Sequence, residues 1–254
     1  MITPDLDKIA TDLEGLEETI IARLIDRAQF RRNLLAYQPG KSGFKGEAAL
    51  SLFALRLKFQ EEMDACFGRF AVPEERPFNK NLPDAKRIVR LPDHCLQLTD
   101  YNAVNLTDKI LTSYLDLVPQ ICATGDDAQY GSSVEHDVYT IQAISRRIHY
   151  GAMYVAETKY LSDPETFRSA VDAKDTRTLE TLLTRPEVER KILQRVEEKV
   201  TVLQAAAKAD TRITIDPGVV RDYYAAYIIP LTKEGEILYL LNRENRSAEN
   251  IQWN

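Results

Sequence analysis

The chain of 254 residues has a formal net charge of -6 and only 10 glycines and 11 prolines. Apolar residues recur at helical spacing almost throughout, so we expect a mostly α-helical chain that is long enough for one large domain or two small ones. The acidic balance without a long Lys/Arg run argues against nucleic-acid binding, and without 18 consecutive apolar residues no membrane span is expected.

Two features of the sequence suggest a cytoplasmic protein. The N-terminal stretch MITPDLDKIATDLEG is polar and acidic, which argues against a signal or transit peptide. The cysteines Cys66, Cys95 and Cys122 lie far apart, without the CxxC spacing of a metal or redox site. We therefore expect reduced thiols and no metal centre.

The first half of the chain predicts three helices separated by loops. They span about residues 5–35, 44–70 and 105–122, where Leu, Ile and other apolar residues recur at steps of three and four. YQPGKSG at 37–43 is a turn by its Pro and Gly content. Four prolines fall within about 71–102, which predicts an irregular connection long enough to suggest a functional role.

The second half predicts further helices from their start signals. Ser132 and Glu135 have the spacing of a capping box, which would open a long helix. A cap followed by proline at the first helical position is predicted at residues 163–164, 185–186 and 216–217. The last of these pairs begins a helix from about 217 to 229, and another helix follows Pro230. The polar tail, about 246–254, is expected to fray.

Cations lie on or beside the apolar face of the long helix. Its apolar residues, at steps of three, four and seven, are Val134, Val138, Ile141, Ile148, Ala152 and Val155. Lys159 continues this stripe, and a cation directed at a core needs an anionic partner, a route to water or a ligand. At most one of the adjacent Arg146 and Arg147 should face a pocket. Surface ion pairs for the arginines and snorkelling of Lys159 remain the simpler alternatives.

Candidate acids lie on two other helices. Glu236 shares a helix face with Thr232, and burial beside Tyr239 would raise its pKa and allow a protonated carboxyl to donate a hydrogen bond. A solvated face in TKEGE is the alternative. Glu189 lies in a first helical turn, where an acid commonly only complements the helix dipole. His149 is expected to be a structural hydrogen bonder. These spacings alone do not define a reaction.

Three stretches, SRRIHYG, VAETKY and IIPLTKEGEILYLLNRE, resemble the eukaryotic-type, yeast-like chorismate mutases, which are all-helical. LEETIIARLIDRAQF, GFKG, GSSVEHD and PEVERKILQRV match in the same chain order, so the similarity covers about residues 6–244. The resemblance implies an all-α, multi-helix bundle that forms a single domain over residues 1–254. It also implies a homodimeric isomerase of phenylalanine and tyrosine biosynthesis. Such an enzyme converts chorismate to prephenate by an intramolecular [3,3] rearrangement without a cofactor or metal.

The rearrangement needs cations for two substrate carboxylates and a hydrogen-bond donor at the ether oxygen, where negative charge develops. The resemblance implies that Arg147 binds the side-chain carboxylate and that Thr232 lies near the ring carboxylate. It implies that Lys159 reaches a carboxylate and the ether oxygen, where Glu236 acts in its protonated form. Glu189 is implied to hold the ring hydroxyl. Arg185 occupies a substrate-binding position at which the contact is expected to use backbone.

The sequence departs from the family pattern at two places in this site. Ala10 replaces an arginine that clamps a carboxylate, a loss expected to cost about 2–5 kcal/mol. A locally different helix register or an engineered substitution would explain the alanine, and impaired or altered catalysis is the sharper alternative. Arg147 and Lys159 are 12 residues apart, where the family has eleven. Twelve residues of α-helix end about 120° off the starting face. A π-bulge between Gly151 and Val155 would restore the register.

The resemblance also implies a tyrosine or tryptophan effector site at the dimer interface. Arg69, Gly131 and Ser132 match it, but Gly68 replaces a second arginine and Glu135 replaces a threonine. An added acid and a lost cation should weaken the capture of an amino-acid carboxylate, so we expect altered or absent effector control. A catalytically weak, mutase-like binding or regulatory protein is one alternative, and a helical scaffold unrelated to chorismate is another.

Overall fold

The computed structural model describes residues 5–205 and 212–244, and every regular element within these ranges is helical. This confirms the predicted all-α fold. The α-helices are α1 (Leu6–Arg27), α2 (Leu52–Cys66), α3 (Thr107–Ile121), α4 (Tyr130–Tyr150), α5 (Ala156–Ser162), α6 (Pro164–Asp172), α7 (Thr176–Leu183), α8 (Pro186–Ala205), α9 (Pro217–Tyr223) and α10 (Ile229–Asn242). No helix in the described part of the chain is long and apolar enough to cross a membrane.

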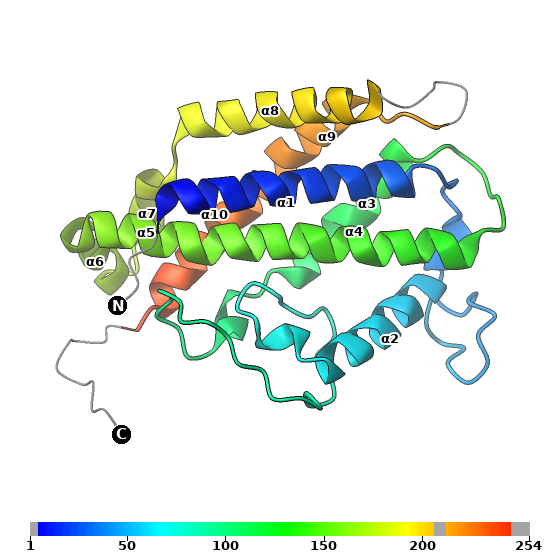
Figure 1. Cartoon of the computed structure of the whole chain (residues 1–254), viewed down its shortest axis with the longest axis horizontal. Coiled ribbons are helices and arrows are strands. Elements are labelled where there is room, and N and C mark those ends of the chain that lie inside the picture. Colours follow the sequence, from blue (N-terminus) through cyan, green and yellow to red (C-terminus); the bar gives the residue numbers. More distant parts are fainter. Residues whose placement is uncertain (1–4, 206–211, 245–254) are drawn as a thin grey trace.

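Three long helices, α1, α4 and α8, lie side by side, and each contributes residues to the larger apolar core. Figure 1 shows α8 alongside α1 and α1 alongside α4, with α2 on the opposite side of α4. The inward residues Ile20, Ile21 and Leu24 of α1 are fully buried at spacings of one, three and four, as expected for a helix that contacts neighbours on two sides. The apolar stripe of the first helix is therefore buried over its second half, whereas Leu6 at its start is 55% exposed.

A buried ion pair joins these helices. Arg27 at the end of α1 donates through Nε to Asp137 of α4 at 2.6 Å, and both side chains are fully buried. The Asp137 carboxylate also accepts hydrogen bonds from the hydroxyls of Tyr37 and Tyr114, each at 2.7 Å. These bonds offset the desolvation of the two charges and fix the positions of α1, α3 and α4.

The first two helices are shorter than the sequence predicts. α1 ends at Arg27 rather than near residue 35, because Arg27 Nη1 donates to the carbonyls of Phe30 and Arg31 and holds the chain in a turn. Asn33 then adopts a left-handed backbone with φ of 51°. α2 begins after Ser51, whose hydroxyl caps it by accepting from the Ala54 amide at 3.1 Å.

In the second half of the chain, the prolines predicted the helix starts better than the polar capping residues did. Asp163 and Asp216 cap α6 and α9 through their side chains, as predicted. α8 begins at Pro186, but it is the carbonyl of Arg185 that accepts from the following amides, while its side chain is exposed. The predicted capping box is wrong: α4 begins at Tyr130, before Ser132, and no side chain in the described chain caps it.

Two π-helices continue the long helices. The segment 151–155 is a π-helix that joins α4 to α5, which confirms the predicted bulge. A second π-helix at 224–228 joins α9 to α10, so the predicted break near 229 is wrong. Pro230 lies in the first turn of α10, directly after this widened turn. The wider turn already disrupts the regular hydrogen-bond ladder there, so a residue without an N–H is tolerated.

The long connection between α2 and α3 is irregular, as predicted, apart from short 3₁₀ turns at Arg69–Ala71 and Tyr101–Val104. The buried carboxylate of Glu61 holds it by accepting from the amides of Phe78 and Asn79, each at 2.8 Å. The fraying predicted for residues 246–254 concerns a stretch outside the described residues.

Candidate active site

The candidate site lies where the continuous α4–α5 helix crosses α10, and Arg147 lies at its centre. Arg147 is 3% exposed and donates through Nη1 to the hydroxyl of Thr232 at 3.0 Å. Its Nη2 lies 3.9 Å from a carboxylate oxygen of Glu17, and its guanidinium is 5.9 Å from the centre of the Tyr224 ring. Its Nε is buried without a hydrogen-bond partner among the described residues. Arg147 can therefore bind a further anionic group.

Lys159 approaches the same helix from α5. Its Nζ donates to a carboxylate oxygen of Glu236 at 3.0 Å and to the carbonyl oxygen of Leu183, at the end of α7, at 2.7 Å. The side chain of Lys159 is 20% exposed. It therefore combines an anionic partner with a short route to water, two of the conditions for an inward cation.

Glu236 is buried beside this lysine and its protonation is finely balanced. Burial raises the pKa of its carboxyl to about 7, and the charge and hydrogen bond of Lys159 limit that rise. The raised pKa expected for a buried Glu236 is confirmed, and the solvated-face alternative is excluded for this residue. Near neutral pH the carboxyl is protonated in a large fraction of the molecules and can donate a hydrogen bond.

Thr232 and Glu189 are the other predicted residues at the site. The hydroxyl of Thr232 donates to the carbonyl of Ile228 at 2.7 Å, which leaves its oxygen to accept from Arg147. Glu189, in the first turn of α8, pairs with Lys233 of α10 at 3.0 Å. This ion pair brings the start of α8 against the site face of α10, so Glu189 does more than complement its own helix.

The π-helix brings both cations onto α10 despite their 12-residue separation. Arg147 reaches Thr232 while Lys159 reaches Glu236, one helical turn further along α10. A regular α-helix would have directed these two side chains about 120° apart. The structure therefore joins Arg147, Lys159, Thr232 and Glu236 in one cluster.

Helix α1 contributes one side of the site without an arginine. Ala10 is exposed and lies seven residues before Glu17, on the same helix face. Lys8 lies on a different face, where it lines a cavity of about 550 Å³ with Tyr150 and Tyr154. Position 10 therefore lacks the positive charge that was expected there to bind a substrate carboxylate.

Sequence reasoning missed an ion cluster behind Arg147. Glu17 is fully buried and accepts two hydrogen bonds from Arg195 of α8, at 2.9 and 2.7 Å. Lys199 lies 3.7 Å from the same carboxylate. The available signal was the position of Glu17 within the apolar stripe of α1, four residues after Leu13 and three before Ile20.

The remaining predicted residues lie apart from this cluster. Arg185 is exposed and donates to the carbonyls of Leu182 and Thr184, so its side chain turns back onto α7. Arg69 pairs with Asp64 and Glu75 and donates to Gln142 of α4 at 2.7 Å. Gly131 and Ser132 lie in the first turn of α4, 11 and 10 residues before Gln142 and about 16 Å away along the helix. Within a single chain, Arg69 therefore lies apart from Gly131 and Ser132.

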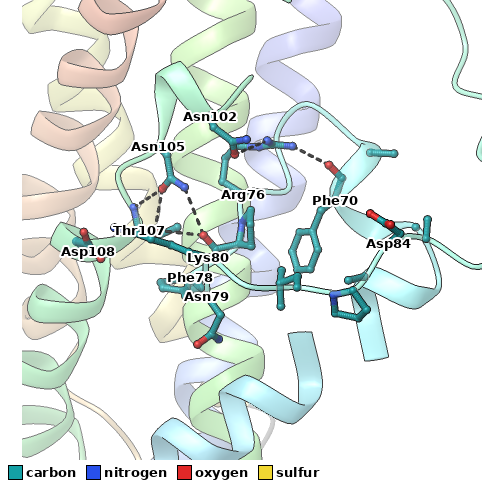
Figure 2. Close-up of a pocket in the computed structure, with 17 residues that line it drawn as sticks. Phe70, Arg76, Phe78, Asn79, Lys80, Asp84, Asn102, Asn105, Thr107 and Asp108 are labelled. Carbon is teal, nitrogen blue, oxygen red and sulfur yellow. Dashed lines mark hydrogen bonds between the residues drawn. The ribbon is translucent and has the colours of Figure 1, made fainter. Parts of the chain in front are cut away.

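The large cavity of the irregular connection is also separate from the cluster. It has a volume of about 700 Å³ and lies beside the start of α3 (Figure 2). Asn105 donates to the carbonyl of Pro77 at 3.3 Å, and Arg76 donates to that of Phe70 at 3.0 Å. Its lining in the described chain includes none of the residues expected to bind substrate.

Comparison with known proteins identifies the family. The chain is 36% identical to a chorismate mutase of Schizosaccharomyces pombe, over 94% of this chain and 96% of that protein. It is 35% identical to a chorismate mutase of Emericella nidulans, over 98% and 94% of the two chains. No protein-family model matches the chain.

Solved structures agree with these relatives. The chorismate mutase of Candida albicans in complex with L-Trp superposes with a TM-score of 0.85 at 31% identity, covering 94% of this chain and 91% of that one. AtCM1 with tyrosine bound in its allosteric site superposes with a TM-score of 0.82 at 36% identity, covering 93% and 95%. The fold is that of an all-helical class of isomerases. The chain belongs to the chorismate mutase family.

Proposed function

We propose that this protein is a chorismate mutase, which rearranges chorismate to prephenate in phenylalanine and tyrosine biosynthesis. The observation that carries the proposal is the convergence on α10 of two cations with a buried carboxyl. Arg147 has an unused buried donor, Lys159 lies 3.0 Å from Glu236, and Glu236 has a pKa near the middle of the physiological range. A compact dianion that develops charge on its ether oxygen requires this combination.

The reaction is intramolecular, so the protein transfers no atom or electron pair to the substrate. The ether C–O bond breaks while a C–C bond forms, and negative charge grows on the ether oxygen. Lys159 and protonated Glu236 flank that oxygen and donate hydrogen bonds that strengthen as the charge develops. A bound dianion would further raise the pKa of Glu236, which favours its donor form.

The other predicted residues orient the substrate. Arg147 binds the side-chain carboxylate through its free Nε and a neighbouring Nη group, and Thr232 lies close to the ring carboxylate. Glu189, held by Lys233, accepts from the ring hydroxyl. Arg185 contributes through its backbone, since its side chain is turned onto α7. These contacts select the folded conformation in which the reacting carbons are close.

Arg147→Ala with Arg146→Ala as its matched control tests this assignment. Arg146 is the adjacent residue, is 46% exposed, and lies 3.5 Å from Glu74 and Glu75. The disappearance of chorismate, followed by absorbance, should slow by about 2–5 kcal/mol of activation free energy, at least ~30-fold, in Arg147→Ala. Arg146→Ala should stay close to the unmodified protein.

Two outcomes would favour the alternatives. Turnover no faster than the uncatalysed reaction, with a bicyclic transition-state analogue still bound in calorimetry, would indicate a mutase-like binding or regulatory protein. Failure to bind that analogue would indicate a helical scaffold unrelated to chorismate.

We propose further that two copies of the chain form a homodimer. Phe59 and Met63 on α2 and Phe67 directly after it follow each other at steps of four and are 41%, 50% and 66% exposed, which makes an apolar face suited to a second copy. A dimer is also required if Arg69 is to share a ligand with Gly131 and Ser132, which lie far from it within one chain.

We propose that effector control by tyrosine or tryptophan is altered or absent, because capture of the amino-acid carboxylate is weakened. The Candida albicans relative was solved with L-Trp, and AtCM1 carries tyrosine in its allosteric site. Here the charge of Arg69 is already offset by two carboxylates, and Glu135 pairs with Arg56 at 3.1 Å. The absorbance assay with and without each amino acid tests this, and a severalfold change in rate would contradict it.

We propose a single domain over residues 1–254 and a cytoplasmic location. The three cysteines are free thiols, which suits a reducing compartment. A cytosolic chorismate mutase of Zea mays is 33% identical over 91% of this chain, whereas other plant relatives are chloroplastic. Cell fractionation tests the location, and one cooperative unfolding transition would support one domain.

A further inference from the structure

Two glycines lie where the helices of the candidate site cross. Gly151 opens the 151–155 π-helix, and Gly235 lies in the interior of α10 directly before Glu236. Glycine is among the least favourable residues inside a helix, so its presence there calls for a packing reason.

Backbone geometry does not require either glycine. Gly151 has φ of -58° and ψ of -46°, which any residue adopts in a helix, and Gly235 is not among the positive-φ residues. What is lacking is space. A Cβ atom on Gly235 would lie 2.6 Å from the Cβ of Ala152 and 3.2 Å from a methyl carbon of Leu106. The Cβ of Ala152 is fixed to the backbone, so one of the two helices would have to move.

Gly151 makes the corresponding close contact, in this case with α10. A Cβ on Gly151 would lie 3.0 Å from Cγ2 of Thr232 and 3.5 Å from Nη1 of Arg147. The π-helix therefore places Gly151 against Thr232, and α10 places Gly235 against Ala152. Both contacts are next to the hydrogen bonds that join Arg147 to Thr232 and Lys159 to Glu236.

We propose that Gly151 and Gly235 are positioning residues that let the π-helix and α10 approach closely enough for Arg147 and Lys159 to meet Thr232 and Glu236. The importance for catalysis rests on the proposed mutase function, whereas the geometric role does not. A side chain at either position moves the two halves of the site apart, although none of the substrate-binding side chains is itself replaced.

Gly235→Ala tests the proposal, with Ala152→Gly and the double variant completing the cycle. A displacement of about 1 Å should lower kcat on the order of 10- to 100-fold. KM should change less, because the Lys159 and Glu236 contacts strengthen in the transition state. Ala152→Gly in the Gly235→Ala background removes the facing Cβ and should restore most of the rate. Gly15→Ala is the control, since a Cβ at this exposed helical glycine of α1 meets nothing within 4 Å.

A second cycle uses the other glycine. Gly151→Ala should impair the unmodified protein but have little effect in a Thr232→Ser background, where the methyl group is gone and the hydroxyl that accepts from Arg147 remains. This cycle keeps the proposal testable if Gly235→Ala fails to fold. Rates in both glycine variants equal to that of Gly15→Ala, or no relief by either partner substitution, would overturn it.

An independent readout separates this inference from the proposed function. The pKa of Glu236 can be followed by carbon NMR of the carboxyl group without any substrate. Separation from Lys159 removes the interaction that lowers that pKa, so it should rise in Gly235→Ala and return in the double variant. An unchanged pKa would overturn the positioning role even in an active enzyme. Absence of chorismate turnover in the unmodified protein would instead contradict the proposed function alone.

Discussion

At Glu236 two opposing influences act on a single carboxyl group. Burial disfavours the carboxylate, and Lys159, 3.0 Å away, favours it. Burial is the larger effect, and the resulting pKa of about 7 lies well above the 4.5 of an ordinary glutamate. The donor role that we propose for Glu236 at neutral pH therefore depends on the packing around this residue.

The pH dependence of the reaction follows from the protonation of Glu236. Below pH 7 the carboxyl is mostly protonated and can donate, and above pH 7 it loses that proton. We expect kcat/KM, which reports the free enzyme, to fall as pH rises through about 7. Glu236→Gln keeps a neutral donor that does not ionise, so this fall should disappear in a pH–rate profile. An identical fall in the variant would assign the titration to another group.

Ala10 leaves one side of the site without a cation. We expect Ala10→Arg to raise kcat/KM by on the order of tenfold or more, because a charge-assisted contact to a carboxylate in a partly buried site is strong. Ala22→Arg, at another exposed alanine of α1, controls for the added charge. The absorbance assay measures both variants. Equal rates in the two would show that position 10 does not reach the substrate.

At the scale of the elements, the hydrogen bonds around Asp137 join three helices and a 3₁₀ turn. Its carboxylate accepts from Arg27 of α1, Tyr114 of α3 and Tyr37 of the 3₁₀ turn Leu34–Tyr37. Asp137→Ala leaves the guanidinium of Arg27 buried without its counter-ion, and the free energy of unfolding should fall by about 3–5 kcal/mol.

Urea denaturation measures this loss, and Asp116→Ala provides the comparison. Asp116 is exposed on α3, so its replacement should change stability by less than about 0.5 kcal/mol. A similarly small effect of Asp137→Ala would mean that water or a rearranged side chain satisfies Arg27.

Some elements were predictable because their signals are local. The aspartate–proline starts at 163 and 216 use residues next to the helix. The 12-residue spacing of Arg147 and Lys159, compared with the eleven of the family they resemble, indicated a local change of helical period. The end of α1 was not predictable, because Arg27 turns the chain through carbonyls beyond the helix while its charge is held by Asp137, 110 positions away. The second π-helix carried no comparable signal.

The candidate site shows the same division. Arg147, Lys159 and Glu236 were predictable because their phase and family motifs are visible along the chain. Arg195, which holds Glu17, was not, because the pair is separated by 178 positions and depends on how α1 lies against α8. Arg69 and Gly131 were assigned to a shared site that one copy of the chain does not assemble.

On the scale of the whole molecule, the candidate site lies between two apolar clusters. Ile148 and Leu231 belong to the larger cluster of α1, α3, α4, α8 and α9. Ala152 and Leu240 belong to the smaller cluster that includes α5, α6 and α7. The continuous α4–α5 helix and α10 therefore each contribute to both apolar clusters. The polar residues of the candidate site meet at the boundary between these clusters.

The proposed dimer is tested on the exposed face of α2. Phe67→Glu places a charge on that face and should convert a dimer into monomers, measured by light scattering coupled to size-exclusion chromatography. Val202→Glu, at a 69% exposed residue of α8, should leave the mass unchanged. Chorismate turnover should largely persist in the monomer, because the predicted catalytic side chains come from one chain. A monomeric unmodified protein would contradict the dimer.

The π-helix at 151–155 also affects how related sequences should be aligned. It takes up one extra residue inside a continuous helix, while Arg147 before it and Lys159 after it keep their places against α10. A relative in which these two cations are eleven positions apart, instead of the 12 found here, therefore corresponds to this chain only through a one-residue gap within the helix. A procedure that allows gaps only in loops would pair Lys159 with the wrong residue and make an intact site look degenerate.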